Sequence, residues 1–154
     1  MMWPMPRLRG RESDRRRRAR FERLVDEAVD ELVAEIKRRR EDGVLSPRFA
    51  ERYLGAIEEV AIVIADEPDA RQREENEYAE RLLGIYEGVP MTEWAADQAL
   101  IPPRITIFRR AIEAISVSPQ RQRTEVRTTV KHEIAHHLGW SDEQLDELGL
   151  GDAD

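Results

Sequence analysis

The chain has 154 residues, of which 40% are hydrophobic and 37% are charged, and its formal net charge is −7. It contains no cysteine, which excludes disulfide bonds and thiolate metal sites, so any metal ion would need nitrogen and oxygen ligands. No apolar run is long enough to span a bilayer, and the N-terminus has no export signal. We therefore expect a cytoplasmic protein with one compact domain and no membrane partner.

The positive charge is concentrated at the N-terminus, where residues 1–20 carry eight arginines against two acidic residues. The arginine block at 15–20 could contact nucleic acid, but no aromatic residue for base stacking and no recognisable nucleic-acid fold accompany it. We therefore expect residues 1–20 to form a disordered arginine-rich tail that does not bind nucleic acid. Residues 21–154 should then form the folded domain.

Two helices are predicted first. Apolar residues at i, i+3, i+4 and i+7 predict a helix over residues 21–40, ended by Asp42-Gly43. Ser46-Pro47 is typical of an N-cap followed by proline at the first helical position, and it predicts a short helix to about residue 58. The apolar residues of this second helix that we expect to be buried are Phe49, Tyr53, Leu54 and Ile57.

The middle of the chain has the composition of strands and loops. Residues 60–64 are a β-branched apolar run and predict a strand, as do residues 82–86 and the alternating segment 104–108. Residues 69–77 are nearly all polar and predict a loop, and residues 94–103 are expected to be irregular.

A long helix is predicted from Ser118-Pro119 to Leu138, because the N-cap and proline pattern recurs there. Its buried side should carry apolar residues at steps of four. These are Val126, Val130, Ile134 and Leu138.

All three histidines lie within six consecutive positions near the end of this helix. His132-Glu133-x-x-His136 is the H-E-x-x-H pattern of zinc hydrolases, in which two histidines four apart share one helix face and can hold one metal ion. The pattern predicts that His132 and His136 bind one Zn²⁺ and that Glu133 is the general base for the water that zinc activates. His137 is turned about 100° from His136 around the helix, so we expect a core or supporting histidine there. A polar face that carries histidines by chance is the alternative.

The third metal ligand is predicted to be Asp142, which follows a helix stop at Gly139 and could fold back toward the metal. The segment Ser141-Asp142-Glu143-Gln144 is also typical of a capping box that opens a last helix. Carboxylates of that helix are then the competing ligands. They are Glu143, Asp146 and Glu147.

With these motifs the chain resembles the small bacterial zincin-like metallopeptidases, a family with a minimal zincin fold. The resemblance covers roughly residues 20–150 and is carried mainly by segments 83–90, 103–109 and 132–142. It implies an α+β fold, with a small mixed β-sheet beside the helix that carries H-E-x-x-H and helices on one side. In zincins the edge strand of the sheet commonly aligns an extended peptide over the zinc, which suggests residues 104–108 as the substrate strand.

The chain departs from the longer metzincin pattern at two points. Asp142 stands where metzincins usually carry histidine, and no methionine follows Met91, so the methionine-bearing turn is absent. The resemblance is therefore to a reduced zincin. It implies a zinc-dependent metallopeptidase acting on a peptide or protein substrate. A non-catalytic zincin-fold module that binds a protein or nucleic-acid partner is the alternative.

Overall fold

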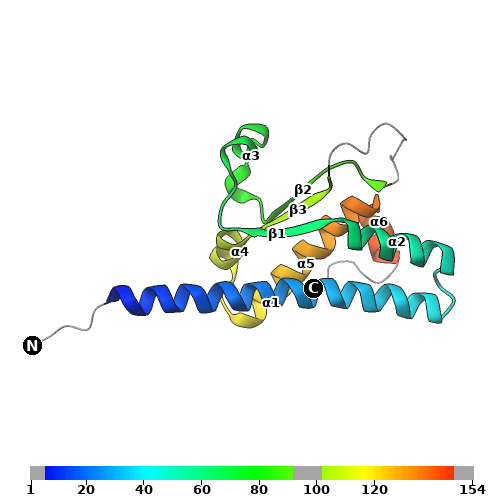
Figure 1. The fold of residues 1–154 in the computed structure, drawn as a ribbon, viewed down its shortest axis with the longest axis horizontal. Helices are drawn as coiled ribbons and strands as arrows, with labels where there is room; N and C mark the ends of the chain where they lie inside the picture. The colour runs from blue at the N-terminus through cyan, green and yellow to red at the C-terminus, as the bar shows by residue number, and fades with distance from the viewer. Residues whose placement is uncertain (1–5, 92–101, 148–154) are drawn as a thin grey trace, which may run out of the picture.

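The computed structural model describes residues 6–91 and 102–147. A three-stranded sheet lies beside a group of helices, and the long helix α1 runs along the whole assembly (Figure 1). The α+β fold expected from the sequence is confirmed. The elements in chain order are α1 (Pro6–Glu41), α2 (Pro47–Glu59), β1 (Ala61–Ala65), α3 (Ala70–Glu75), the 3₁₀ turn η1 (Ala79–Arg81), β2 (Gly84–Glu87), β3 (Arg104–Phe108), α4 (Arg109–Ile115), α5 (Pro119–Leu138) and α6 (Asp142–Glu147).

The sheet is mixed, as expected, with the strand order β1-β3-β2. β1 is parallel to β3, with Val63 opposite Thr106, and β2 is antiparallel to β3, with Ile85 opposite Thr106. β3 is therefore the central strand, and its backbone groups are used on both sides. The prediction that residues 104–108 align a substrate is wrong for this reason, because an edge strand is needed for that role.

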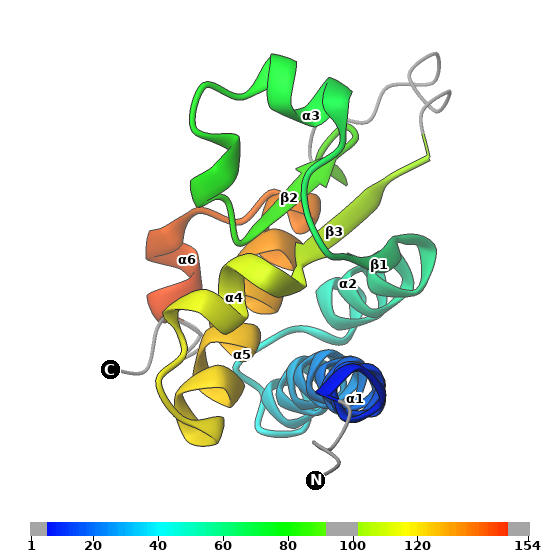
Figure 2. The same cartoon turned by 90° about the vertical axis from the view of Figure 1, so that its left-hand side faces the viewer.

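The core lies between the sheet and the helices α1, α2 and α5, which pack on one side of it, while α3 lies on the other side (Figure 2). The predicted apolar stripe of α5 is confirmed, since its four residues are fully buried. The stripe of α1 that faces it is buried as well. It consists of Phe21, Val25, Ala28, Leu32 and Ile36.

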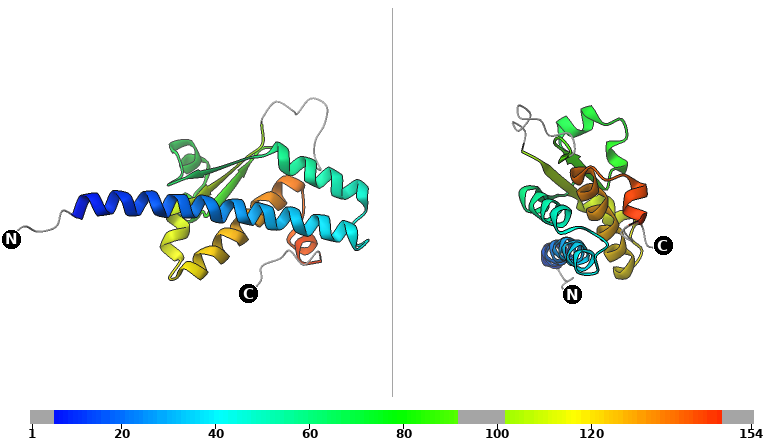
Figure 3. Two further views of the ribbon diagram at one scale, coloured as in Figure 1. Left: turned by 60° about the horizontal axis from the view of Figure 1, so that its bottom comes forward. Right: turned by 90° about the vertical axis from the view of Figure 1, so that its right-hand side faces the viewer.

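The N-terminal arginine-rich segment is helical. α1 begins at Pro6 and not near Phe21, so the prediction of a disordered tail is wrong for residues 6–20; residues 1–5 lie outside the described part of the chain. Arginine is a good helix former, and the strong helix over residues 21–41 can extend backwards at little cost because its nucleus already exists. Figure 3 shows this part of α1 reaching past the sheet and the other helices.

A buried arginine connects α1 to the sheet. The side chain of Arg109, at the start of α4, is only 2% exposed. Its guanidinium donates to Asp66 at 2.9 Å, to Asp14 of α1 at 3.0 Å and to Glu113 at 2.9 Å. These three carboxylates satisfy a charge that would otherwise be very costly to bury. The hydrogen bond from Arg109 holds the pKa of the Asp66 carboxyl below its usual value.

Two local predictions are wrong. Residues 69–77 were expected to be a loop, but α3 forms there and is opened by a reciprocal capping box in which Asp69 and Gln72 bind each other's backbone N–H groups. The helix has almost no apolar residue to give it a periodic pattern. Phe49 was expected to be buried, but it is 49% exposed and stacks on Tyr53 at 6.2 Å.

No helix in the described ranges 6–91 and 102–147 is long and apolar enough to cross a membrane. The cytoplasmic location stays a prediction.

We expect Asp66→Asn to lower the free energy of unfolding by roughly 1 kcal/mol at pH 7, because the partly exposed acceptor of the Arg109 hydrogen bond loses its negative charge. The folded-state pKa of Asp66 is lowered, so its stabilisation is present above the unfolded value of about 3.9 and is lost as the pH falls through the folded value. Urea unfolding of both proteins between pH 7 and pH 3 should therefore show a difference that shrinks below about pH 4. Glu67→Gln is the control, since Glu67 is exposed and pairs with exposed arginines. A difference that persists unchanged at pH 3 would contradict this role of Asp66.

Candidate metal centre

Helix α5 carries the motif and is well defined at both ends. The hydroxyl of Ser118 accepts from the backbone N–H of Arg121 at 3.0 Å, and Pro119 follows at the first helical position. At the other end Gly139 has a φ of 74°, which is the left-handed conformation of a glycine C-cap. The N–H of Gly139 donates to His136 O at 3.1 Å, and that of Trp140 donates to Ala135 O at 2.8 Å. The predicted helix stop is confirmed, and it falls directly after the motif.

The structure brings three motif side chains together. His132, Glu133 and His136 each offer one possible ligand atom, and these atoms lie within 4.8 Å of one another. The two imidazole rings are 4.5 Å apart between centroids, and Glu133 Oε2 is 3.6 Å from His136 Nδ1. Glu133 is 7% exposed, whereas the side chain of His136 is 48% exposed. A sheltered carboxylate thus lies beside two imidazoles, one of which is open to solvent.

This set of donors fits zinc. Two imidazole nitrogens and a carboxylate are the ligand types that Zn²⁺ takes in proteins without thiolates. A helix presents residues i and i+4 one above the other, so His132 and His136 can hold the same ion without a change in the backbone. Glu133 is displaced around the helix from this pair, which leaves its carboxylate beside the ion position.

Strand β2 passes very close to Glu133. Gly84 is buried there, and a Cβ atom on it would lie 2.9 Å from Thr129 Cγ2 and 3.3 Å from Glu133 Cγ. Only a residue without a side chain lets β2 and α5 approach so closely. The glycine therefore helps to hold the Glu133 side chain in place. Gly84 is not among the residues predicted for the site, although a glycine inside a strand pattern is a known sign of a close backbone approach.

His137 belongs to the core, as the sequence analysis expected. It is fully buried, and its Nε2 donates to Ala56 O of α2 at 2.8 Å, since a carbonyl can only accept. Burial holds the pKa of His137 below its usual value, so the ring is neutral and its Nδ1 accepts from the Tyr86 hydroxyl at 2.8 Å. The same hydroxyl lies 3.0 Å from Val89 O. These contacts join the end of α5 to α2 and to β2, next to the motif.

After the motif, the packing of Trp140 and a capping box at the start of α6 determine the path of the chain. Trp140 is buried, and its ring packs edge-on against Tyr53 at 4.8 Å. Ser141 and Gln144 form the capping box that the sequence indicated, with side-chain to backbone hydrogen bonds of 3.1 and 2.8 Å. Asp142 is the first residue of α6, three residues after the helix stop at Gly139.

The structure does not test the third ligand. The side chains of Asp142 and Glu147 lie outside the described residues. Glu143 and Asp146 are exposed on α6. The choice between Asp142 and the other carboxylates therefore stays a prediction.

Comparison with known proteins relates the chain to a family. The family model described as Zincin-like metallopeptidase matches residues 57–151, which is well over half of the chain. The match starts in α2 and takes in the whole sheet, α5 and the H-E-x-x-H motif, whereas α1 lies outside it. No curated protein matches the chain.

We expect Gly84→Ala to lower the free energy of unfolding by about 1–3 kcal/mol, because the new methyl group would overpack the space between β2 and α5. Thr129→Ser removes the methyl group at 2.9 Å, so the double variant should recover part of this loss in urea unfolding. Gly55→Ala is the control, since nothing lies within 4 Å of a Cβ there and alanine favours helix α2. Equal stability of Gly84→Ala and the wild type would show that the close approach is not needed.

Proposed function

Because this chain belongs to the zincin-like metallopeptidase family, we propose that it is a zinc-dependent peptide hydrolase in which His132 and His136 bind the metal ion and Glu133 is the general base. The observation that carries the proposal is the arrangement of the motif, with a buried carboxylate beside two imidazoles that share one face of α5. Family membership alone supports a metallopeptidase, and the geometry supports these roles for the three side chains.

The metal would be held by the imidazole nitrogens of His132 and His136, with the Asp142 carboxylate as the proposed third ligand. When bound, zinc supplies a Lewis acid that polarises a carbonyl group and lowers the pKa of a water molecule to about 7. The exposure of His136 leaves this side of the site open to a substrate from solvent.

Glu133 would accept the proton of the attacking water and pass it to the nitrogen of the leaving amine. Its burial suits this task, because a carboxylate shielded from bulk water is not strongly solvated and keeps a defined position. Gly84 lies against the stem of this side chain and acts as a positioning residue.

We further propose that an extended peptide binds along the outer edge of β2, which pairs with no strand in the described part of the chain. Leu83 O accepts from Phe108 N, so by the alternation of an antiparallel pair the backbone groups of Gly84 and Tyr86 point away from β3. β2 is also the strand that approaches Glu133. Pairing with an edge strand binds the peptide backbone without requiring a particular side-chain sequence.

We expect Glu133→Gln to keep zinc and to lower peptide hydrolysis by about 10²- to 10⁴-fold, because the amide has the shape of the carboxylate but cannot take up a proton. His136→Ala should lose both zinc and activity. Metal content and turnover of a peptide library would be measured for each variant. Glu125→Gln is the control on the same helix, where the carboxylate pairs with Arg121 away from the motif.

Loss of zinc in Glu133→Gln would instead indicate that Glu133 is a metal ligand and not the general base. A wild-type protein that is fully loaded with zinc and hydrolyses no peptide would contradict the proposed function.

We expect Asp142→Ala to weaken zinc binding at least about 100-fold, since losing even an outer hydrogen-bond partner of a ligand costs 10- to 100-fold. Glu143→Ala, Asp146→Ala and Glu147→Ala should bind zinc as the wild type does. Titration with a competing chelator measures all four affinities. A large loss in one of the last three variants, with Asp142→Ala unaffected, would assign the third ligand to that residue and not to Asp142.

A further inference from the structure

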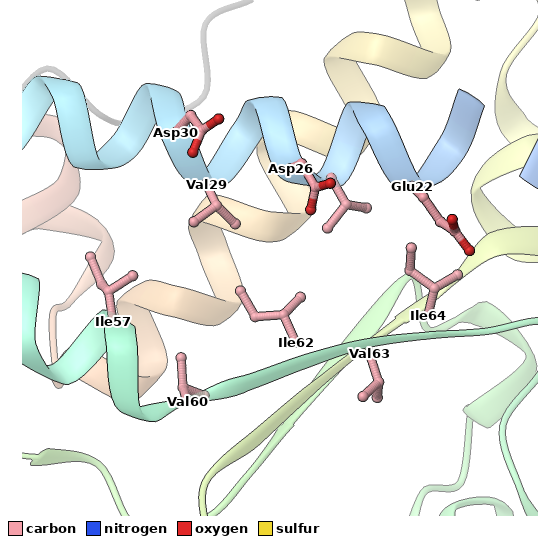
Figure 4. Close-up of a pocket in the computed structure, with 10 residues that line it drawn as sticks. Glu22, Asp26, Val29, Asp30, Ile57, Val60, Ile62, Val63 and Ile64 are labelled. Carbon is pink, nitrogen blue, oxygen red and sulfur yellow. The ribbon is translucent and has the colours of Figure 1, made fainter. Parts of the chain in front are cut away.

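A groove of about 750 Å³ lies between α1 and β1, at the opposite edge of the sheet from β2. Figure 4 shows apolar side chains of the strand pointing up toward the helix and carboxylates on the helix above them. The apolar lining includes Ile62 and Ile64 of β1 and Ile57 of α2, with Val29 facing them from α1. The carboxylates along its rim belong to Glu22, Asp26 and Asp30.

The strand in this groove has a free edge. The N–H of Ala61 donates to Pro103 O on the β3 side at 3.2 Å, so by the alternation of a parallel pair the backbone groups of Ile62 and Ile64 point away from β3. In the described part of the chain no strand pairs with this side of β1. An exposed edge of this kind can accept a further strand.

The distance between successive carboxylates of the rim is close to the distance between alternate side chains of a β-strand. Glu22, Asp26 and Asp30 follow at i, i+4 and i+8, and an α-helix therefore repeats them about every 6 Å. Every second residue of a β-strand recurs about every 6.6–6.8 Å and points to the same face. Three alternate residues of a strand laid along β1 would thus meet the three carboxylates in turn.

The charges of this row favour a cationic partner. All three residues are exposed, and in the described ranges 6–91 and 102–147 only Glu22 has an ion-pair partner, Arg18 at 3.9 Å. Lysine and arginine have apolar stems that can lie over Ile62 and Ile64 while the charged end reaches the rim. The groove therefore offers a suitable surface for both parts of such side chains.

We propose that this groove binds an extended segment of a partner protein, which adds to the free edge of β1 and carries lysine or arginine at alternate positions. A second copy of this chain is a poorer fit, because its arginine-rich block at 15–20 is helical and cannot pair as a strand. β3 and β2 separate the groove from Glu133, so this surface is distinct from the proposed hydrolytic site and does not depend on it.

The probe for this proposal is a blocked nine-residue peptide of alternating lysine and threonine, with a second peptide in which glutamate replaces lysine. The lysine peptide should bind the full chain, and the glutamate peptide should not. Asp26→Asn combined with Asp30→Asn should weaken the binding about fivefold or more, because two ion pairs of modest strength are lost. Glu51→Gln combined with Glu74→Gln changes the net charge equally at exposed sites outside the groove and should leave the affinity unchanged.

Amide hydrogen exchange reports on the strand itself. Exchange at Ile62 and Ile64 should slow when the lysine peptide binds, whereas Ile105 in the central strand should not change. Equal weakening by the two double variants would show only general attraction to an acidic protein and would overturn the proposal. So would binding without any slowing at Ile62 and Ile64, or a dimer of the wild type that is lost in the Asp26/Asp30 variant while the peptide fails to bind.

Discussion

The burial of α5 is the constraint on which the rest of the structure depends. One side of this helix packs against α1 and the sheet, while an adjacent face presents the H-E-x-x-H motif. The fully buried residues Val130 and Ile134 fix the rotation of the helix, and this rotation decides that Glu133 is sheltered while His136 reaches solvent. A hydrolytic site needs this combination, because the base must be held firmly and the substrate must still have access to it.

Strand β2 contacts helix α5 at two points, one at Glu133 and one just beyond the motif. Gly84 lets β2 approach the stem of Glu133, and the Tyr86 hydroxyl meets His137 one residue beyond the second histidine of the motif. The same strand thus supports the proposed base and the end of the helix. Residues that contact neither metal nor substrate can in this way set the positions of those that do.

Within the described residues 6–91 and 102–147, both outer edges of the mixed sheet are unpaired, and their surroundings differ. β2 lies beside the motif, and β1 lies beside an acidic row of α1, with β3 paired between them. α1 lies outside the residues matched by the family model, yet it supplies five core residues. Its Asp14 also accepts a hydrogen bond from the buried Arg109. This helix is therefore part of the folded domain. It also supplies the acidic side of the groove next to β1, and this side lies outside the region matched by the family model.

The sequence by itself determined the features that rest on local chemistry. Ser46, Ser118 and Gly139 mark helix ends through their own hydrogen bonds and backbone conformation, and the i, i+4 spacing of two histidines predicts their shared face. For this reason the main helices, the strands and the three motif side chains that meet could be predicted.

The tertiary structure alone decided which strand is central, how far α1 extends, and what surrounds the motif. Strand order depends on pairing between segments far apart in the chain, and an alternating pattern such as 104–108 is the same in a central and an edge strand. The N-terminal part of α1 brings Asp14 to the buried Arg109, although the two residues are 95 positions apart. Long-range packing and charge pairing of this kind leave no periodic signal in the sequence, because each partner alone is an ordinary residue.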